Sequence, residues 1–336
     1  MNKARNVLTL VLCAAMLAFS NSAAFAATKS STATPPATQN QELRVSPVKT
    51  DITVAAGTTG TVKIIVSNLT NNTVTVQPIE NDFIASGEEG QAALILSPDS
   101  YAPSHSLKRF MVPLSNITLP PKGGDAITVQ ITVPKTAQAG GYFGALRFEP
   151  VIPGASSSAS SVALGESVAS LILMTVPGPT FEQLELTNFD VEQNGSTAGN
   201  FRTPNALNLF VRFENKGNLQ ESPFGQVDVQ KGKKVLYTYN FNQTDPKSEI
   251  LPDSFRRWTI PLKGFGKFGK YTVSGTFTYG TNGNTIDIDK TIWIIPTTYI
   301  LAIVIIVVVL LIAAGGLWVF LKSYKRKILR SSRRRY

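Results

Sequence analysis

The residue types that most often carry catalysis are few and scattered in this 336-residue chain. His105 is the single histidine, and it stands between Ser104 and Ser106. A Ser-His-Asp triad would need His105 as its base, and one histidine without cysteine partners cannot build a metal site. No G-x-S-x-G motif is present to hold a nucleophile. We interpret His105 as a surface residue in a loop that enters a strand.

Acidic pairs are the next candidates for acid–base or metal chemistry. Glu88-Glu89 lies in Gly-rich turn sequence, which indicates solvated surface rather than the carboxylate pair of a glycosidase. Asp287 and Asp289 alternate along a predicted strand, but two carboxylates two residues apart are a weak calcium signal. The chain has no phosphate loop and no dinucleotide fingerprint. We therefore predict a non-enzymatic protein with no catalytic residue, cofactor or metal.

One basic and aromatic segment has the composition of a binding surface, with no acid from Ser254 through Tyr271. Basic groups pair with phosphates, and aromatic rings stack on flat or cationic partners. The expected ligand is an anionic cell-wall polymer or the phosphate headgroups of a membrane. In the alternative interpretation, the aromatic rings fill a core and the lysines are solvated. The candidate polymer-binding residues are Arg256, Arg257, Trp258, Lys263, Lys267 and Lys270.

These residues must be positioned by the rest of the chain, which ends in a long apolar stretch. Tyr299 to Leu321 contains 23 residues and no charged side chain. A helix of this length spans about 34 Å, enough to cross a hydrocarbon core of about 30 Å. We predict a transmembrane helix over residues 297–321. Its expected interface anchors are Trp293, Tyr299, Trp318 and Tyr324.

The basic tail that follows, residues 322–336, sets the predicted orientation. It holds eight Lys and Arg and no acid. Because positively charged flanks stay in the cytoplasm, the C-terminus is expected there, and the preceding domains outside the cell. The predicted location is the plasma membrane, crossed once. The residues expected to contact the anionic inner leaflet are Lys322, Lys325, Arg326 and Lys327.

The N-terminus has the signature of an export signal. Lys3 and Arg5 precede the apolar run Val7–Phe19, and Ala24-Phe25-Ala26 fits a cleavage site. We predict a signal peptide over residues 1–26. A Ser/Thr/Pro-rich leader follows over residues 27–41, which has too few apolar residues to fold.

The net charge of +10 does not indicate a nucleic-acid partner. The signal peptide holds two of the 32 Lys and Arg and the tail holds eight, which leaves 22 in the exported part. All 22 Asp and Glu also lie in that part, so it is neutral overall. Cys13, the only cysteine, lies in the signal peptide, so the mature protein is expected to have no disulfide.

Between Leu43 and Pro296 the pattern is β throughout, with alternating apolar and polar residues between turn signals. In the first half, strands are expected at Leu43–Val48, Ile52–Val54, Thr61–Ser67, Thr73–Phe83, Ala92–Leu96, Phe110–Leu114, Ala126–Val133, Tyr142–Pro150 and Ser167–Val176. In the second half, they are expected at Leu184–Val191, Ala206–Glu214, Gly225–Gln230, Lys234–Phe241, Arg257–Leu262, Tyr271–Tyr279 and Thr285–Ile295.

The two halves share one order of features. A strand ending in Asn68 or Asn215 is followed by a tight turn, a Leu-Pro dipeptide, another strand and a Gly followed directly or one residue later by Tyr. We therefore predict an all-β fold of two tandem Ig-like β-sandwich domains, residues 42–177 and 178–296, plus one C-terminal transmembrane α-helix. Segment 154–165 is rich in Ser and Ala. It is interpreted as a solvated hairpin tip or an insertion that contacts a partner.

In this architecture the chain resembles the WxL-interacting proteins of Gram-positive cell surfaces. The motifs that carry the resemblance are Val45-Ser46-Pro47, Leu119-Pro120-Pro121-Lys122, Gly140-Gly141-Tyr142-Phe143-Gly144 and Leu251-Pro252-Asp253-Ser254. The resemblance implies a signal peptide, two Ig-like domains, one transmembrane helix and a short basic tail. It also implies that the first domain binds peptidoglycan and that the second binds host or partner proteins.

The function expected from these features is that of a membrane-anchored cell-surface binding or scaffold protein without catalysis. Its partner would be a cell-wall polymer or a secreted surface protein. A short connector to the membrane favours such contact over direct adhesion to a host cell. Two alternatives remain. One is a chaperone-like sandwich that assists exported proteins by strand addition, and the other is a cell-wall-modifying enzyme.

Overall fold

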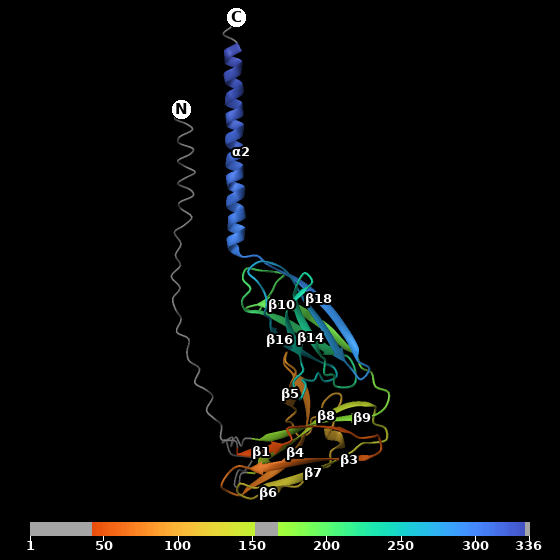
Figure 1. The fold of residues 1–336 in the computed structure, drawn as a ribbon. Helices are drawn as coiled ribbons and strands as arrows, with labels where there is room; N and C mark the ends of the chain where they lie inside the picture. Colours follow the sequence, from red (N-terminus) through yellow and green to blue (C-terminus); the bar gives the residue numbers. More distant parts are fainter. Residues whose placement is uncertain (1–41, 152–166, 333–336) are drawn as a thin grey trace. The chain divides into compact units, whose positions relative to one another are not determined.

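The computed structural model describes residues 42–151 and 167–332, with side chains described through Ser323. The predicted signal peptide, the leader and segment 154–165 lie outside the described residues. The described chain is mostly β, with one long helix at its C-terminal end (Figure 1). The predicted fold class is therefore confirmed as all-β with a C-terminal apolar helix. The assignment of the sheets to Ig-like domains stays a prediction.

The first lobe comprises residues 42–176. Its strands are β1 (Leu43–Ser46), β2 (Lys49–Thr53), β3 (Thr59–Asn68), β4 (Val74–Ser86), β5 (Gln91–Leu94), β6 (Ile117–Leu119), β7 (Gly124–Thr132), β8 (Gly140–Pro150) and β9 (Val168–Val176). One sheet has the order β1-β3-β7, and the other has the order β2-β9-β8-β4-β5 with β6 beside β4. Alternate side chains of β3, including Val62, Ile64 and Val66, point into the core between these sheets.

The second lobe comprises residues 184–294. Its strands are β10 (Leu184–Gln193), β11 (Ser196–Thr197), β12 (Asn200–Phe201), β13 (Leu207–Asn215), β14 (Phe224–Lys231), β15 (Lys234–Phe241), β16 (Ser254–Pro261), β17 (Gly269–Tyr279) and β18 (Asn284–Ile294). The sheets have the orders β11-β10-β13-β16 and β12-β18-β17-β14-β15. The rings of Phe213, Phe241 and Phe277 meet in the core with centroids 5.0–6.1 Å apart.

The internal repeat has a common structural basis in two buried asparagines. Asn68 Nδ2 donates to the Asn72 carbonyl (2.7 Å) and to the Pro120 carbonyl (3.0 Å). Asn215 Nδ2 donates to the Leu219 carbonyl (2.6 Å) and to the Ile250 carbonyl (2.9 Å). Each side chain therefore ties the turn after its strand to the Leu-Pro segment of the same lobe.

The strand predicted at Phe110–Leu114 is wrong. This region forms the 3-10 helix η1 (Lys108–Phe110), followed by a single bridge from Met111 to Ile131. Buried Asp82 explains the difference because it accepts hydrogen bonds from the Ser106 hydroxyl (2.6 Å) and the Lys108 amide (2.8 Å). These bonds fold the segment before Met111 into a turn, which leaves too little extended chain for a strand.

Helix α2 (Thr297–Ser332) begins two residues after β18 ends. Its apolar part, Thr297–Ser323, has 27 residues and contains an 18-residue window with a mean hydropathy of 3.3, so it could span a membrane. The helix starts at Thr297, and the bounds of the membrane-spanning part stay a prediction. The helix continues past the predicted end at residue 321, through most of the basic tail.

The two lobes are joined by direct hydrogen bonds, both between backbone groups and from a side chain to the backbone. The Gly141 amide donates to the Asn218 carbonyl (2.7 Å), and Asn218 Nδ2 donates to the Ala139 carbonyl (2.9 Å). Gly140, with φ of +140°, makes this approach possible because a Cβ there would lie 2.8 Å from the Asn218 carbonyl oxygen. At a second contact, the Arg257 amide at the edge of β16 donates to the Glu88 carbonyl in the β4–β5 turn (2.6 Å).

Candidate functional site

A groove lies where the two lobes meet. Its cavity has a volume of about 290 Å³. The apolar floor is formed by the partly buried Leu171 of the first lobe and Leu251 of the second lobe. Both pack on a small cluster where Phe83, Leu173 and Phe143 are buried. The residues that line the groove are Lys49, Phe83, Gly90, Gln91, Ala92, Leu171, Leu173, Lys247, Ser248, Glu249, Leu251 and Arg256.

Charged groups on the groove wall link the lobes. Lys49 Nζ lies 2.6 Å from Glu249 Oε2, and their side chains are 25% and 20% exposed. Burial raises the pKa of the Glu249 carboxyl, and the ion pair with Lys49 opposes that rise. Arg256 donates to the Glu249 carbonyl (3.1 Å), and burial lowers the pKa of its guanidinium. Three cations and one acid therefore line the groove, and Asp51 lies just outside it, 3.4 Å from Lys49 Nζ.

This combination suits an extended peptide better than a sugar polymer. A peptide can place apolar side chains on the floor and a carboxylate beside Arg256 or Lys247. The one aromatic residue of the lining is Phe83, which is only 4% exposed and so offers no ring face for stacking.

The six predicted polymer-binding residues do not form one surface. On β16, Arg256 lines the groove, whereas Arg257 lies 5.2 Å from the Phe210 ring centroid on the opposite face of the strand. Trp258 packs in the core of the second lobe, with its centroid 5.1 Å from that of Phe241. Lys263 and Lys267 lie between β16 and β17, and Lys270 lies at the start of β17, next to α2. The position of Trp258 fits the alternative interpretation, in which aromatic rings fill the core. Polymer binding stays a prediction.

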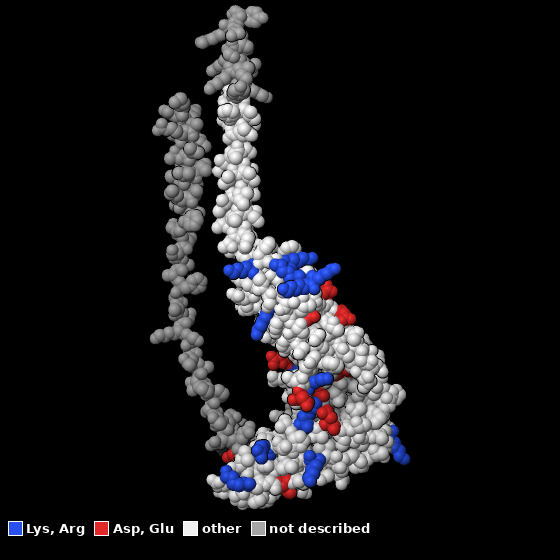
Figure 2. All heavy atoms as spheres, in the orientation of Figure 1, with Lys and Arg blue, Asp and Glu red and all other residues white. Residues whose placement is uncertain are grey.

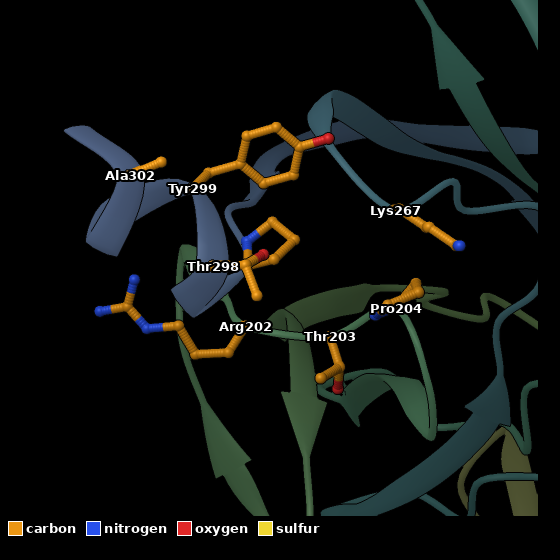
Figure 3. Close-up of a pocket in the computed structure, with 8 residues that line it drawn as sticks. Arg202, Thr203, Pro204, Lys267, Thr298, Tyr299 and Ala302 are labelled. Carbon is orange, nitrogen blue, oxygen red and sulfur yellow. The ribbon is translucent and has the colours of Figure 1, made fainter. Parts of the chain in front are cut away.

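A second pocket of about 540 Å³ lies at the start of α2 (Figure 3). Its lining residues are Arg202, Thr203, Pro204, Lys267, Pro296, Thr298, Tyr299 and Ala302. Figure 3 shows Arg202 and Lys267 on opposite sides of this pocket. The Tyr299 ring stacks on Phe268, with centroids 5.1 Å apart and planes inclined by 26°.

The predicted interface anchors lie near the two ends of the apolar helix. Trp293 is 41% exposed, Tyr299 50% and Trp318 63%. Lys322 Nζ lies 4.7 Å from the Trp318 ring centroid. The side chains of Tyr324, Lys325, Arg326 and Lys327 lie outside the described residues. Membrane contact of the anchors stays a prediction.

His105 is placed at the junction of the lobes rather than on an open surface. Its Nδ1 lies 2.6 Å from the Gly141 carbonyl oxygen, and its Nε2 lies 3.9 Å from Asp253 Oδ2 of the second lobe. Ser104 Oγ donates to the same carboxylate (3.3 Å). In a catalytic triad the histidine stands between serine and carboxylate. Here both Ser104 and His105 contact Asp253, so the three residues link the lobes instead.

No family model matches the chain, and no curated protein matches its sequence. Three solved structures of chaperones are similar to it. The class 5 fimbriae chaperone CfaA has 12% identity over 76% of this chain and 99% of its own, with a TM-score of 0.39. The E. coli chaperone DraB has 14% identity over 75% and 96%, with a TM-score of 0.34. The Pseudomonas aeruginosa CupB2 chaperone has 10% identity over 74% and 100%, with a TM-score of 0.30.

No sequence pattern indicated a buried acid at the lobe junction. Glu221 is 3% exposed, accepts a hydrogen bond from the Gly280 amide (3.0 Å), and has no partner in the structure for its Oε1. Burial, with a contribution from the nearby Glu182 carboxylate, raises its pKa to about 7. Lys49 and Glu249 were also missed, because residues far apart in the sequence form the groove.

Proposed function

We propose that this chain is a single-pass, membrane-anchored binding protein without catalytic activity, and that its partner is another exported protein. In this proposal α2 spans the plasma membrane with its basic end in the cytoplasm, and both lobes stand outside. The groove between the lobes holds an extended segment of the partner. The observation that carries the proposal is the pairing of an apolar floor, formed by the partly buried Leu171 and Leu251, with the cations Lys49, Lys247 and Arg256.

The hydrogen bonds at the lobe junction support this assignment. They hold the groove walls together before any ligand arrives, which lowers the entropy that binding must overcome. Burial lowers the pKa of the Arg256 guanidinium, and Glu89 and Glu249 oppose that change, so a partner carboxylate beside Arg256 would add to their effect. The predicted segment is therefore apolar and acidic. A cell-wall polymer finds no exposed aromatic platform among the residues that line this groove.

Anchoring is tested by fractionation of cells that make the full chain. We expect it to stay in the membrane pellet through alkaline carbonate extraction. External protease should then digest the lobes and leave the C-terminal end protected. Val308→Lys together with Ile312→Lys should release the chain, because each charge at mid-span costs about 3 kcal/mol. Extraction of the wild-type chain, or digestion of its C-terminal end from outside, would overturn the anchor.

Partner binding is tested by photo-crosslinking in intact cells. A photoreactive residue replaces exposed Gln91 at the groove or, as a matched control, exposed Thr285 on β18. We expect a discrete crosslinked protein from Gln91 and none from Thr285. Arg256→Glu should abolish the crosslink, whereas Arg257→Glu, on the opposite face of the same strand, should leave it. Equal labelling at both positions would reject the groove.

A strand-adding chaperone is the second candidate, favoured by the edge of β7. The second half of this edge is occupied, because the Val112 amide donates to the Gln130 carbonyl (3.0 Å). In the first half, the Ala126 amide donates to its neighbouring Asp125 carboxylate (2.8 Å) instead of to another strand. An extended client could pair there. A crosslink from exposed Thr128 but not from Gln91 would favour this candidate over the first.

A further inference from the structure

The two ends of the second lobe carry opposite charge. The turns next to α2, taken with the short strands and strand ends that flank them, are residues 194–206, 231–234 and 262–270, all of them described. They hold seven Lys or Arg and no Asp or Glu. The turns at the other end are residues 177–183, 216–223, 242–253 and 280–283, and they hold five acids and two lysines. Figure 2 shows Lys and Arg gathered over the second lobe beside the start of α2.

Strand register brings these basic turns to the same level as the helix. Asn200 pairs with Trp293, so Arg202 lies beside the link to α2. Lys270 also pairs with Trp293, from the other neighbour of β18. Lys231 donates to the Phe268 carbonyl (3.3 Å), which places the β14–β15 turn at this end too. The cations therefore surround the point where the chain enters α2.

Exposed rings accompany the cations. Phe268 is 48% exposed and stacks on Tyr299 in the first turn of α2. Trp293, 41% exposed, lies on β18 just before the helix. Aromatic rings of this kind favour the level of lipid headgroups, and cations beside them favour phosphate. The rings and the charges thus indicate the same environment.

We propose that this end of the second lobe, which we name the basic collar (Arg202, Lys231, Lys233, Lys234, Lys263, Lys267 and Lys270), docks on the phosphate headgroups of an anionic phospholipid bilayer. The proposal rests on the proposed function in one respect, that α2 spans that bilayer. Two residues, Ile295 and Pro296, separate β18 from α2. When fully extended, these two residues span about 7 Å, which is less than the Debye length of about 8 Å at physiological salt. The collar charges are therefore within range of the headgroups.

Docking is tested with the full chain reconstituted in lipid nanodiscs. One set contains phosphatidylcholine alone, and the other also contains phosphatidylglycerol. Surface lysines are acylated briefly and quantified by mass spectrometry. We expect acylation of Lys267 and Lys270 to be about threefold lower in the anionic discs, because the amines are engaged with phosphate. Lys216 and Lys247, at the acidic end, should react equally in both. Salt at 1 M should remove the protection, because it shortens the Debye length to about 3 Å.

A pair of variants separates docking from folding. Arg202→Glu with Lys263→Glu should abolish the protection of Lys267 and Lys270 in anionic discs. Lys216→Glu with Lys122→Glu, a matched change at exposed positions outside the collar, should preserve it. Equal acylation of Lys267 in the two discs, with the protein inserted in both, would overturn the docking surface and leave the anchor intact. Failure of the chain to enter discs of either composition would instead overturn the anchor and, with it, docking.

Discussion

Lys49 at the start of β2 and Glu249 in the second lobe form an ion pair across the lobe junction, with Nζ and Oε2 2.6 Å apart. Because both side chains are largely buried, removal of one partner leaves the other charge poorly solvated. The same two side chains therefore line the groove and stabilise the lobe junction.

Lys49→Met should lower the free energy of unfolding by about 1–3 kcal/mol, since it leaves the Glu249 carboxylate without its cation. Lys49→Met with Glu249→Met should recover most of that loss, because apolar replacements need no solvation. Urea unfolding in detergent micelles measures both. Lys63→Met, at an exposed position of β3, serves as the control and should change stability by less than about 0.5 kcal/mol. A double variant with a lower free energy of unfolding than Lys49→Met would contradict this account.

Glu221 should make stability depend on pH. Its carboxyl pKa is about 7 in the folded chain, against an ordinary value of 4.5. Between these values the folded state binds more protons than the unfolded state, so stability falls as pH rises through this window. The loss has an upper bound of about 3 kcal/mol, at 1.36 kcal/mol per pKa unit.

Glu221→Gln should remove this pH dependence, because a neutral amide keeps the shape of the side chain. We expect the variant to be more stable than wild type at pH 8 and similar to it at pH 4, as measured by the urea midpoint. Glu42→Gln, at an exposed position, is the control and should preserve the wild-type slope. A slope that survives in Glu221→Gln would show that another group is responsible.

Asn68→Ala and Asn215→Ala should have parallel effects in the two lobes. Each change leaves buried turn and Leu-Pro carbonyl groups without a donor, so we expect a loss of at least about 2 kcal/mol in each case. The loss should appear in the unfolding transition of the lobe that carries the change. Asn240→Ala, at an exposed position of β15, should be neutral. If one of the two variants were as stable as the control, the hydrogen bonds of that asparagine would not stabilise its lobe.

Trp258 should matter for folding rather than for a ligand. Trp258→Ala should cost about 3–5 kcal/mol because it opens a cavity beside Phe213 and Phe241. Trp293→Ala, at a more exposed ring, should cost less. Thermal unfolding compares the two variants. If Trp258→Ala left stability unchanged and weakened binding to isolated wall material, Trp258 would be a polymer-binding residue rather than a core residue.

Local signals predicted much of the fold. The alternation that gives β3 its inward Val62, Ile64 and Val66 is visible in the sequence, and so are Asn68 and Asn215 at matching points of the repeat. The strand predicted at Phe110–Leu114 failed because the deciding group, Asp82, comes from a distant strand. A local sequence pattern contains no information about a hydrogen bond supplied by a distant part of the chain.

The site was harder to predict for the same reason. Arg256 and Trp258 are close in the sequence and share one face of β16, yet one side chain lines the groove and the other fills the core. Lys49, Glu249 and Glu221 belong to no motif, and their roles arise only once the lobes meet. The charge asymmetry of the second lobe was present in the sequence, but strand register was needed to assign each turn to an end.

The hydrogen bond from the Arg257 amide to the Glu88 carbonyl has a consequence for biosynthesis. Outer strands with free backbone groups are templates for aggregation, and β16 is such a strand within its own sheet. The β4–β5 turn that shields it belongs to the part of the chain that leaves the ribosome first. During synthesis the β4–β5 turn is therefore already present when β16 emerges. The second lobe expressed without residues 42–176 would instead leave the edge of β16 open to pairing with other copies of itself.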